Sequence, residues 1–271
     1  IEIGRRHYLL YLLLPHPRKI ALLSPGSRER LDQINRRFNE TIYSGESADG
    51  YDAIHGYEAA QHDYPARPLI DSVWRDGGYG RALELGAGSG YFTALIARHA
   101  ERVIAVEPVA DLARVLRERC RAAGLDHVEV ADTTALELGD RVPDRSIDTA
   151  FVIQSLHHFH RRPEVFAALG RAVRPGGRLL LLEPHHNVLR VARLFQRYRS
   201  TYRAPAFWTD ERNWATHDFL TRGELAALSR AGGFEEVRIT GYWIPGSRRL
   251  VPDAERRFRL EGRVGRLPGV R

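Results

Sequence analysis

Three glycines at alternate positions, flanked by two acidic residues, are the part of this sequence with the clearest chemical content. Gly86, Gly88 and Gly90 follow Glu84 closely, and Glu107 comes about one strand later. Glycine permits positive φ angles and removes the Cβ that would keep a ligand away from the backbone. An acidic side chain placed after a strand can accept hydrogen bonds from both hydroxyls of a ribose. The pattern therefore predicts a site for a nucleoside-bearing cofactor.

The neighbouring residues predict the elements that position this site. Residues 81–85 read as a short apolar strand, 91–98 as the start of a helix, and 101–106 as a second strand. The helix would point its first N–H groups and its positive dipole end at the glycine turn, which favours a carboxylate or phosphate. Glu107 would then lie at the carboxyl end of the second strand.

The glycine spacing indicates which nucleoside cofactor fits. Dinucleotide-binding folds use G-x-G-x-x-G, whose third glycine allows close helix–strand packing around a pyrophosphate. This sequence has G-x-G-x-G instead. The tighter turn suits a ligand with a small carboxylate end and no pyrophosphate, and S-adenosylmethionine has that end together with a ribose and an adenine.

These residues resemble the class I S-adenosylmethionine-dependent methyltransferases, and more narrowly their small-molecule branch (the type 11-like methyltransferases). Five segments resemble the family's motifs, in the family's order: 83–93, 103–108, 128–133, 148–159 and 173–184. The resemblance implies that Asp132 receives the adenine amino group. A helix N-cap is the alternative role for this Asp, and both roles are compatible. The full set of cofactor-binding residues that we expect is Glu84, Gly86, Ala87, Gly88, Gly90, Glu107, Pro108, Asp132, Thr133 and Gln154.

The alternation of strands and helices through about residue 183 predicts an α/β fold. The resemblance implies a Rossmann-like, doubly wound and mostly parallel sheet with strand order 3-2-1-4-5-(7)-6. We expect an N-terminal helical extension over 1–75, which forms part of the substrate cover, then the cofactor-binding core over 76–245, and an arginine-rich tail over 246–271. The tail shows no strand pattern, so either the sequence ends before the seventh strand or the sheet edge is open.

Two features after the core strands predict further structure. Pro175-Gly176-Gly177 reads as a turn, and the leucines that follow read as a strand buried on both faces. Residues 185–220 form an insertion rich in aromatic residues beside that fifth strand. Such an insertion is typical of a lid over a substrate site, and an additional helical layer with its own small core is the alternative.

Histidines and one glutamate near the ends of the fourth and fifth strands are the candidates for chemistry on the acceptor. We name His157 and Glu183 as candidate catalytic residues, because a histidine suits general base catalysis near neutral pH. A structural role for either member of the His157-His158 pair is the alternative, and only one of them could face the site if the backbone is extended. The candidate substrate contacts are His158, His185, Tyr202 and Trp208. No histidine spacing matches a zinc or iron framework, so we expect no metal.

Composition limits the possible partners and compartment. The 271 residues carry a net charge of +7, Lys19 is the only lysine, and the arginines are spread along the chain. This diffuse charge does not favour a nucleic-acid partner. The apolar run 8–14 is far too short to span a bilayer, which needs about 20 apolar residues, and we expect it to pack on the domain, with membrane contact as the alternative. We expect a cytoplasmic monomer or homodimer, and a packing role for Cys120.

The sequence thus predicts methyl transfer from S-adenosylmethionine to an O, N or C atom of a small-molecule acceptor, with S-adenosylhomocysteine as product. A non-catalytic cofactor-binding or assembly protein on the same fold is the first alternative, because a fold does not fix a function. An RNA methyltransferase is the second. A nicotinamide dehydrogenase is disfavoured by the glycine spacing and by the lack of a lysine near the core.

Overall fold

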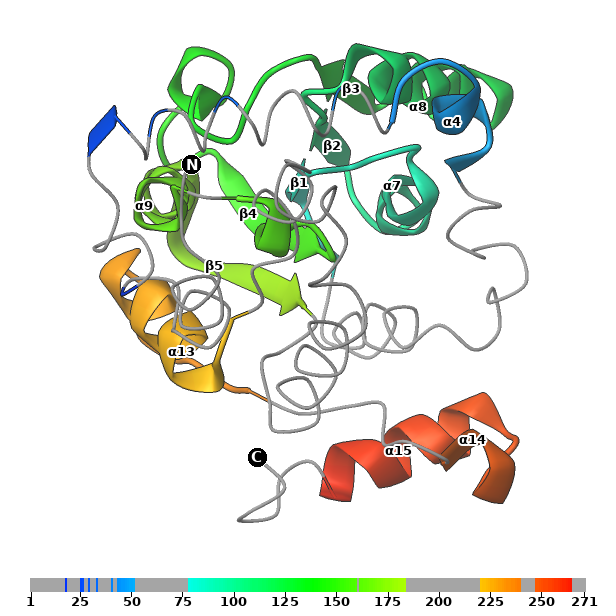
Figure 1. Ribbon diagram of the computed structural model, residues 1–271, viewed down its shortest axis with the longest axis vertical. Helices are drawn as coiled ribbons and strands as arrows, with labels where there is room; N and C mark the ends of the chain where they lie inside the picture. The colour runs from blue at the N-terminus through cyan, green and yellow to red at the C-terminus, as the bar shows by residue number, and fades with distance from the viewer. Residues whose placement is uncertain are drawn as a thin grey trace, which may run out of the picture.

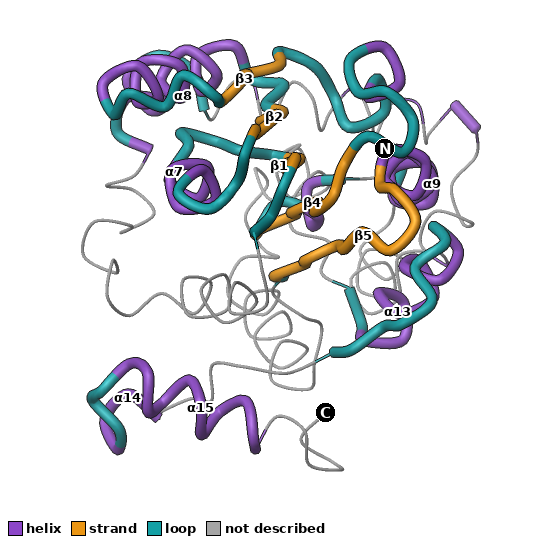
Figure 2. The backbone as a smooth tube through the Cα atoms, turned by 180° about the vertical axis from the view of Figure 1, so that it is seen from behind, coloured by secondary structure: helices purple, strands orange, loops and turns teal. Residues whose placement is uncertain are grey.

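A computed structural model describes residues 43–51, 78–159, 161–183, 220–239 and 247–264, together with isolated residues between 18 and 40. The described residues hold a five-stranded parallel sheet with the order β3-β2-β1-β4-β5 (Figure 2). This order confirms the five-strand part of the predicted topology. The strands are β1 (Arg81–Leu85), β2 (Arg102–Val106), β3 (Val128–Ala131), β4 (Ile147–Ile153) and β5 (Val173–Leu182).

Helices cover both faces of this sheet (Figure 1). Near β1, β2 and β3 lie α7 (Tyr91–Ala97) and α8 (Ala110–Ala122), and beside β4 and β5 lie α9 (Arg162–Ala172) and α13 (Arg222–Ala231). The remaining described helices are α4 (Glu46–Asp49), α14 (Ser247–Leu250) and α15 (Ala254–Val264), with 3-10 turns η2 (Leu138–Asp140) and η3 (Leu156–His158).

The core is divided by the sheet into two apolar clusters. Side chains alternate between the faces of a strand, so Phe151 of β4 joins the cluster beneath α7 and α8, whereas Val152 joins the cluster beneath α9. Burial on both faces explains why the central strands read as nearly continuous apolar runs. Cys120 is buried in the first cluster, where it packs as predicted.

The turn predicted at Pro175–Gly177 is not observed as predicted. This segment lies within β5 rather than in a turn before the strand, and the register between β4 and β5 shifts between Ile147 and Thr149. Gly176 has a φ of 77°, which a bulge can require and glycine supplies. Residues 177–182 are half-buried rather than buried on both faces, because β5 is an edge strand of the sheet that the structure describes.

The last helix of the core begins as its sequence predicts. The hydroxyl of Thr221 accepts a hydrogen bond from the backbone of Glu224, whose carboxylate accepts one from the backbone of Thr221, completing a capping box. The helix α13 ends at Ala231, before the glycines at 232 and 233. Of the predicted sixth strand over 237–243, residues 237–239 show no regular structure and 240–243 lie outside the described residues.

The two regions that flank the predicted core are described in part. In the N-terminal extension, α4 is the main described element, and the predicted helix start at 64–74 lies outside the described residues. In the tail, α14 and α15 form where the sequence analysis identified no helix. Within the described ranges, no helix is both long and apolar enough to cross a membrane.

Candidate functional site

The predicted glycine turn connects β1 to α7 at the carboxyl ends of the strands. Gly86, Gly88 and Gly90 have φ angles of 70°, 57° and 85°, all in the left-handed region that favours glycine. A Cβ added at Gly86 would lie 2.5 Å from the Cβ of Ser155, so this position also needs glycine for close packing. Gly90 is the N-cap residue of α7, as expected for a helix that starts at the turn.

Glu107 reaches back from the end of β2 to this turn. Its Oε2 accepts a hydrogen bond of 2.8 Å from the backbone N–H of Gly88, and its Oε1 accepts one of 2.9 Å from that of Val109. Burial is the main cause that raises the pKa of Glu107 to about 7, against the two backbone hydrogen bonds. The glycine turn and the acidic residue, separated by a strand in sequence, therefore share one site.

Glu84 lies inside the domain, beneath the turn. Its carboxylate accepts a hydrogen bond of 2.6 Å from the hydroxyl of Thr93 in α7, so it ties β1 to the helix that follows. Burial raises the pKa of Glu84 to about 8, and the hydrogen bond from Thr93 lowers it by less. At neutral pH this carboxyl is mostly protonated, which reduces the cost of burying it.

Asp132 follows β3 and lies at the same edge of the sheet. Its carboxylate forms an ion pair of 2.7 Å with Arg117 of α8, and its side chain is 48% exposed. The next helical element, η2, has Glu137 as its N-cap, so the N-cap role considered for Asp132 is wrong. The backbone N–H of Thr133 donates to the carbonyl of Ala131, and the backbone N–H of Thr134 donates to the carboxylate of Glu137. Both N–H groups thus already have partners within the chain.

The other predicted cofactor residues lie on the loops around the turn. Ala87 is buried in the turn itself, and its N–H donates to Val106. Pro108 is exposed directly after Glu107. Gln154 follows β4 with a φ of 51°, a conformation that residues other than glycine adopt only rarely, and its N–H donates to Leu182 of β5 at 2.7 Å.

The two candidate catalytic residues are in direct contact. His157 Nδ1 lies 2.8 Å from Oε2 of Glu183, and the two side chains are only 7% and 3% exposed. The other carboxylate oxygen of Glu183 accepts a hydrogen bond of 2.6 Å from the backbone N–H of Leu156. Glu183, at the end of β5, thus fixes both the η3 backbone and one nitrogen of the His157 ring.

The backbone at His157 and His158 is not extended, so the condition under which only one of them could face the site does not hold. The 3-10 turn η3 holds both residues, and their ring centroids lie 4.3 Å apart. The ring of His158 also lies edge-on to that of Tyr43, with centroids 6.3 Å apart.

The remaining substrate candidates, His185, Tyr202 and Trp208, lie outside the described residues, as does most of the 185–220 insertion. Across the described ranges, no cluster of three or more histidine, cysteine or carboxylate side chains could hold a metal ion.

Two aromatic residues at this site were missed by the sequence analysis. Tyr51 packs over the turn, where a Cβ on Gly88 would meet its ring at 3.4 Å. Tyr43 lies beside Tyr51, with ring centroids 5.4 Å apart, and beside His158. Both come from the N-terminal region, far from the motifs in sequence. The only available signal was the general expectation that residues 1–75 help to cover the substrate.

Comparison with known proteins agrees with this geometry. The methyltransferase domain family matches residues 83–181. An S-adenosyl-L-methionine-dependent Diels-Alderase of Talaromyces variabilis is 31% identical over 104 residues, which are 38% of this chain and 36% of the relative. An uncharacterized methyltransferase of Mycobacterium tuberculosis is 32% identical over 136 residues, which are 48% of this chain and 49% of the relative. The chain thus spans about half or less of the length of these curated relatives.

A solved structure shares the fold. An S-adenosylmethionine-dependent methyltransferase of Thermotoga maritima aligns with a TM-score of 0.51 at 20% identity, covering 73% of this chain and 81% of its own. The matched family, the strand order and the glycine turn joined to an acidic residue all agree. Residues 83–181 of this chain therefore form a domain of the methyltransferase family, with the strand order of the class I fold.

Proposed function

We propose that this protein transfers the methyl group of S-adenosylmethionine to an O, N or C atom of a small-molecule acceptor. The observation that carries the proposal is the hydrogen bond between Gly88 and Glu107, which joins the backbone turn and the ribose acceptor in one site. S-adenosylmethionine bound there supplies a methyl group on a cationic sulfur.

The residues present fit the cofactor. A carboxylate has about four lone-pair sites, and Glu107 uses two of them for Gly88 and Val109. It therefore retains acceptors for two ribose hydroxyls. The hydroxyl of Thr134, two residues after Asp132, is buried with no hydrogen-bond partner in the part of the chain that the structure describes. This hydroxyl offers a donor or an acceptor to a base lying beside Asp132.

The pair His157–Glu183 could remove a proton from the acceptor. When His157 carries its hydrogen on Nδ1, it donates to Glu183, and the tautomer leaves Nε2 as the proton acceptor. Methyl transfer is an in-line displacement in which correct positioning supplies much of the acceleration. A phenol, an acidic carbon or a protonated amine would also need this base. We therefore assign the catalytic role to His157, with Glu183 as its positioning residue.

A transfer assay tests the proposal directly. The full chain is incubated with S-adenosylmethionine labelled on its methyl group and with fractionated metabolite pools, beside the Glu107→Ala variant. We expect label in at least one small-molecule fraction with the unmodified chain and little with the variant. Label transfer to none of the fractions, by a chain that binds the cofactor, would contradict methyl transfer.

The similarity to a Diels-Alderase that depends on the same cofactor favours a second function. In that case the chain would bind S-adenosylmethionine without transferring its methyl group. The assay separates the two functions, because cofactor binding without any label transfer is expected only for the second.

A further inference from the structure

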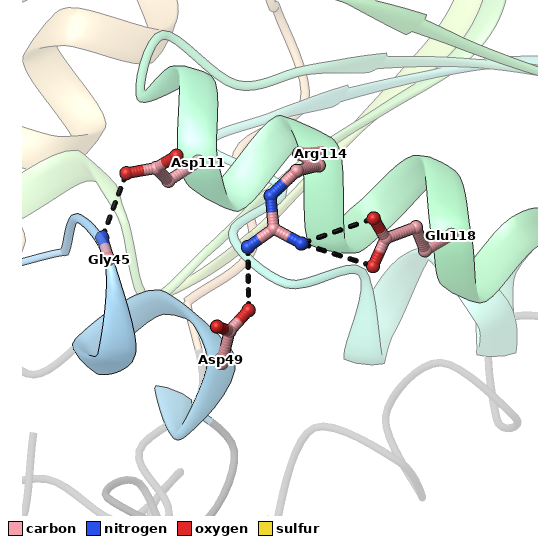
Figure 3. Close-up of polar contacts among 5 residues, drawn as sticks. All are labelled: Gly45, Asp49, Asp111, Arg114 and Glu118. Carbon is pink, nitrogen blue, oxygen red and sulfur yellow. Dashed lines mark hydrogen bonds and ion pairs between the residues drawn. The ribbon is translucent and has the colours of Figure 1, made fainter.

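Residues 43–51 pack against α8 through a small set of polar contacts (Figure 3). The backbone N–H of Gly45 donates to Asp111 at 2.8 Å, at the first turn of α8. One turn further along α8, Arg114 reaches Asp49 of α4 at 2.6 Å. The same guanidinium contacts both carboxylate oxygens of Glu118, at 3.1 and 3.2 Å. We call residues 43–51 the N-terminal cover.

Apolar contacts complete this docking. Ala48 of α4 is fully buried, in a cluster with Val109 and Leu112 at the start of α8. Tyr43 and Tyr51 pack against the same cluster from the two ends of the cover. A helix of four residues is far below the length at which isolated helices are stable in water. The conformation of α4 therefore depends on its contacts with α8.

The cover lies over the proposed cofactor site. The Tyr51 ring is in contact distance of the space above Gly88. Burial raises the pKa of Tyr43, and the negative charge of Glu107 raises it further. Through His158, Tyr43 also contacts the turn that carries the proposed base. The N-terminal segment 43–51 thus contacts the glycine turn through Tyr51 and the histidine turn through Tyr43.

The Tyr51 ring lies over Gly88, so a ligand that reaches the backbone of Gly88 from this side has to pass the ring. We propose that the N-terminal cover moves off Gly88 to admit the cofactor and closes over it again, with Arg114 as the residue that positions the closed cover. This inference rests on the proposed function, because the cofactor is the ligand that it admits. Tyr43 and Tyr51 would then form part of the wall of the occupied site.

Arg114 suits this role because its second partner belongs to its own helix. Glu118 lies four residues after Arg114 and holds the guanidinium whether or not Asp49 is present. The Arg114 side chain therefore loses little additional conformational freedom when it contacts Asp49. The Asp49 and Arg114 side chains are 61% and 43% exposed, and ion pairs this exposed contribute little to stability. Loss of the pair should therefore raise the fraction of molecules with an open cover by roughly two- to fivefold.

Amide hydrogen exchange of the full chain measures this opening. The amide of Gly45 is a direct reporter, because its hydrogen bond goes to Asp111 across the interface. The variants are Asp49→Asn, Arg114→Gln and the two combined. Arg102→Gln is the matched control, because Arg102 forms an exposed pair of 2.7 Å with Glu129 that lies between two strands rather than at the cover.

We expect Asp49→Asn and Arg114→Gln each to speed exchange of the 45–50 amides by roughly two- to fivefold. The double variant should exchange no faster than the single ones, because the same contact is lost. Saturation with S-adenosylhomocysteine, verified by calorimetry, should slow this exchange in the unmodified chain. Arg102→Gln should leave it unchanged.

The outcomes separate this inference from the proposed function. If S-adenosylhomocysteine binds but exchange over 45–50 does not slow, or if Asp49→Asn and Arg114→Gln match Arg102→Gln, the cover is a static part of the fold and the inference is wrong. If S-adenosylhomocysteine does not bind the unmodified chain, the proposed function is wrong and the inference with it.

Discussion

The backbone N–H of Gly88 donates a hydrogen bond of 2.8 Å to the carboxylate of Glu107. The two residues are nineteen positions apart and follow different strands, which shows that the ends of β1 and β2 form one site. Because Gly88 has no side chain and a φ of 57°, its N–H can point at the carboxylate while its Cα faces outward to the cover.

Replacement of Glu107 should separate cofactor binding from folding. In Glu107→Ala the ribose acceptor is lost, and we expect affinity for S-adenosylhomocysteine to fall by about tenfold or more, because hydrogen bonds to charged groups contribute about 1.5–3 kcal/mol each. Titration calorimetry measures the affinity, and circular dichroism checks that the fold persists. Unchanged affinity in a folded variant would show that Glu107 does not contact the ligand.

The pH dependence of binding should follow the ionisation of the same residue. With its pKa raised to about 7 by burial, Glu107 is mainly protonated below neutrality and then has fewer acceptor sites for ribose hydroxyls. Affinity for S-adenosylhomocysteine should therefore rise from about pH 6 to about pH 8, by at most about tenfold per pH unit. Glu107→Gln should flatten this profile, and an equally steep profile in that variant would assign the titration to another group.

The effect of Glu107 on stability has the opposite sign. Its pKa in the folded state is above the ordinary value of 4.5, so between these values the folded chain retains a proton that the unfolded chain releases. The contribution of this residue to the free energy of unfolding is thus fully present below about pH 4.5 and is lost as pH rises through about 7. Thermal melting without ligand tests this sign, with Glu107→Gln as the comparison.

Two glycines offer a matched test of packing in the turn. Gly86 and Gly124 have φ angles of 70° and 65°, so alanine at either position meets a similar strain of about 1–2 kcal/mol. Only Gly86 also faces a neighbour, the Ser155 side chain at 2.5 Å, whereas a Cβ on Gly124 has nothing within 4 Å. Chemical denaturation should show Gly86→Ala to be the more destabilised variant. Equal losses of stability in the two variants would mean that the loop around Ser155 moves to accommodate the added methyl group at no measurable free-energy cost.

Changes in the His157–Glu183 pair should affect turnover more than cofactor binding. We expect His157→Ala to lower the rate of methyl transfer by about 10²–10⁴-fold, the usual contribution of a general base, for an acceptor that must lose a proton. Glu183→Gln should lower it less, because the carboxylate that positions the ring is replaced while the ring itself remains. Single-turnover rates with a labelled methyl group give the comparison.

The alternative for this pair is a structural role. In that case the His157→Ala variant would have a lower melting temperature, because the buried Glu183 carboxylate would lose its partner. The rate of methyl transfer per folded molecule would stay the same. Melting temperature and single-turnover rate measured on the same preparation distinguish the two roles.

Local sequence patterns were sufficient to predict the elements that carry the cofactor site. The strands at 81–85 and 102–106 and the helix from Tyr91 occur within a residue of their expected bounds, because alternation, apolar runs and glycine are local signals. The capping box at Thr221 is equally local. The strand order of the parallel sheet came from the family resemblance.

Contacts between distant segments could not be predicted in this way. Nothing in the sequence around Asp49 indicates that it meets Arg114, sixty-five positions later, or that Tyr51 covers Gly88. The ion pair between Arg117 and Asp132 depends likewise on how α8 packs along β3. The Pro175–Gly177 segment was expected to be a turn before the strand, but it lies within β5, because Val173 before it and Arg178 after it both pair with β4.

Titration of the full chain with S-adenosylhomocysteine tests the central claim most directly. We expect saturable binding of one ligand per chain, raised thermal stability in the presence of the ligand, and loss of most of that affinity in Glu107→Ala. A chain that is folded by circular dichroism yet shows neither binding heat nor a shift in melting temperature would contradict the account.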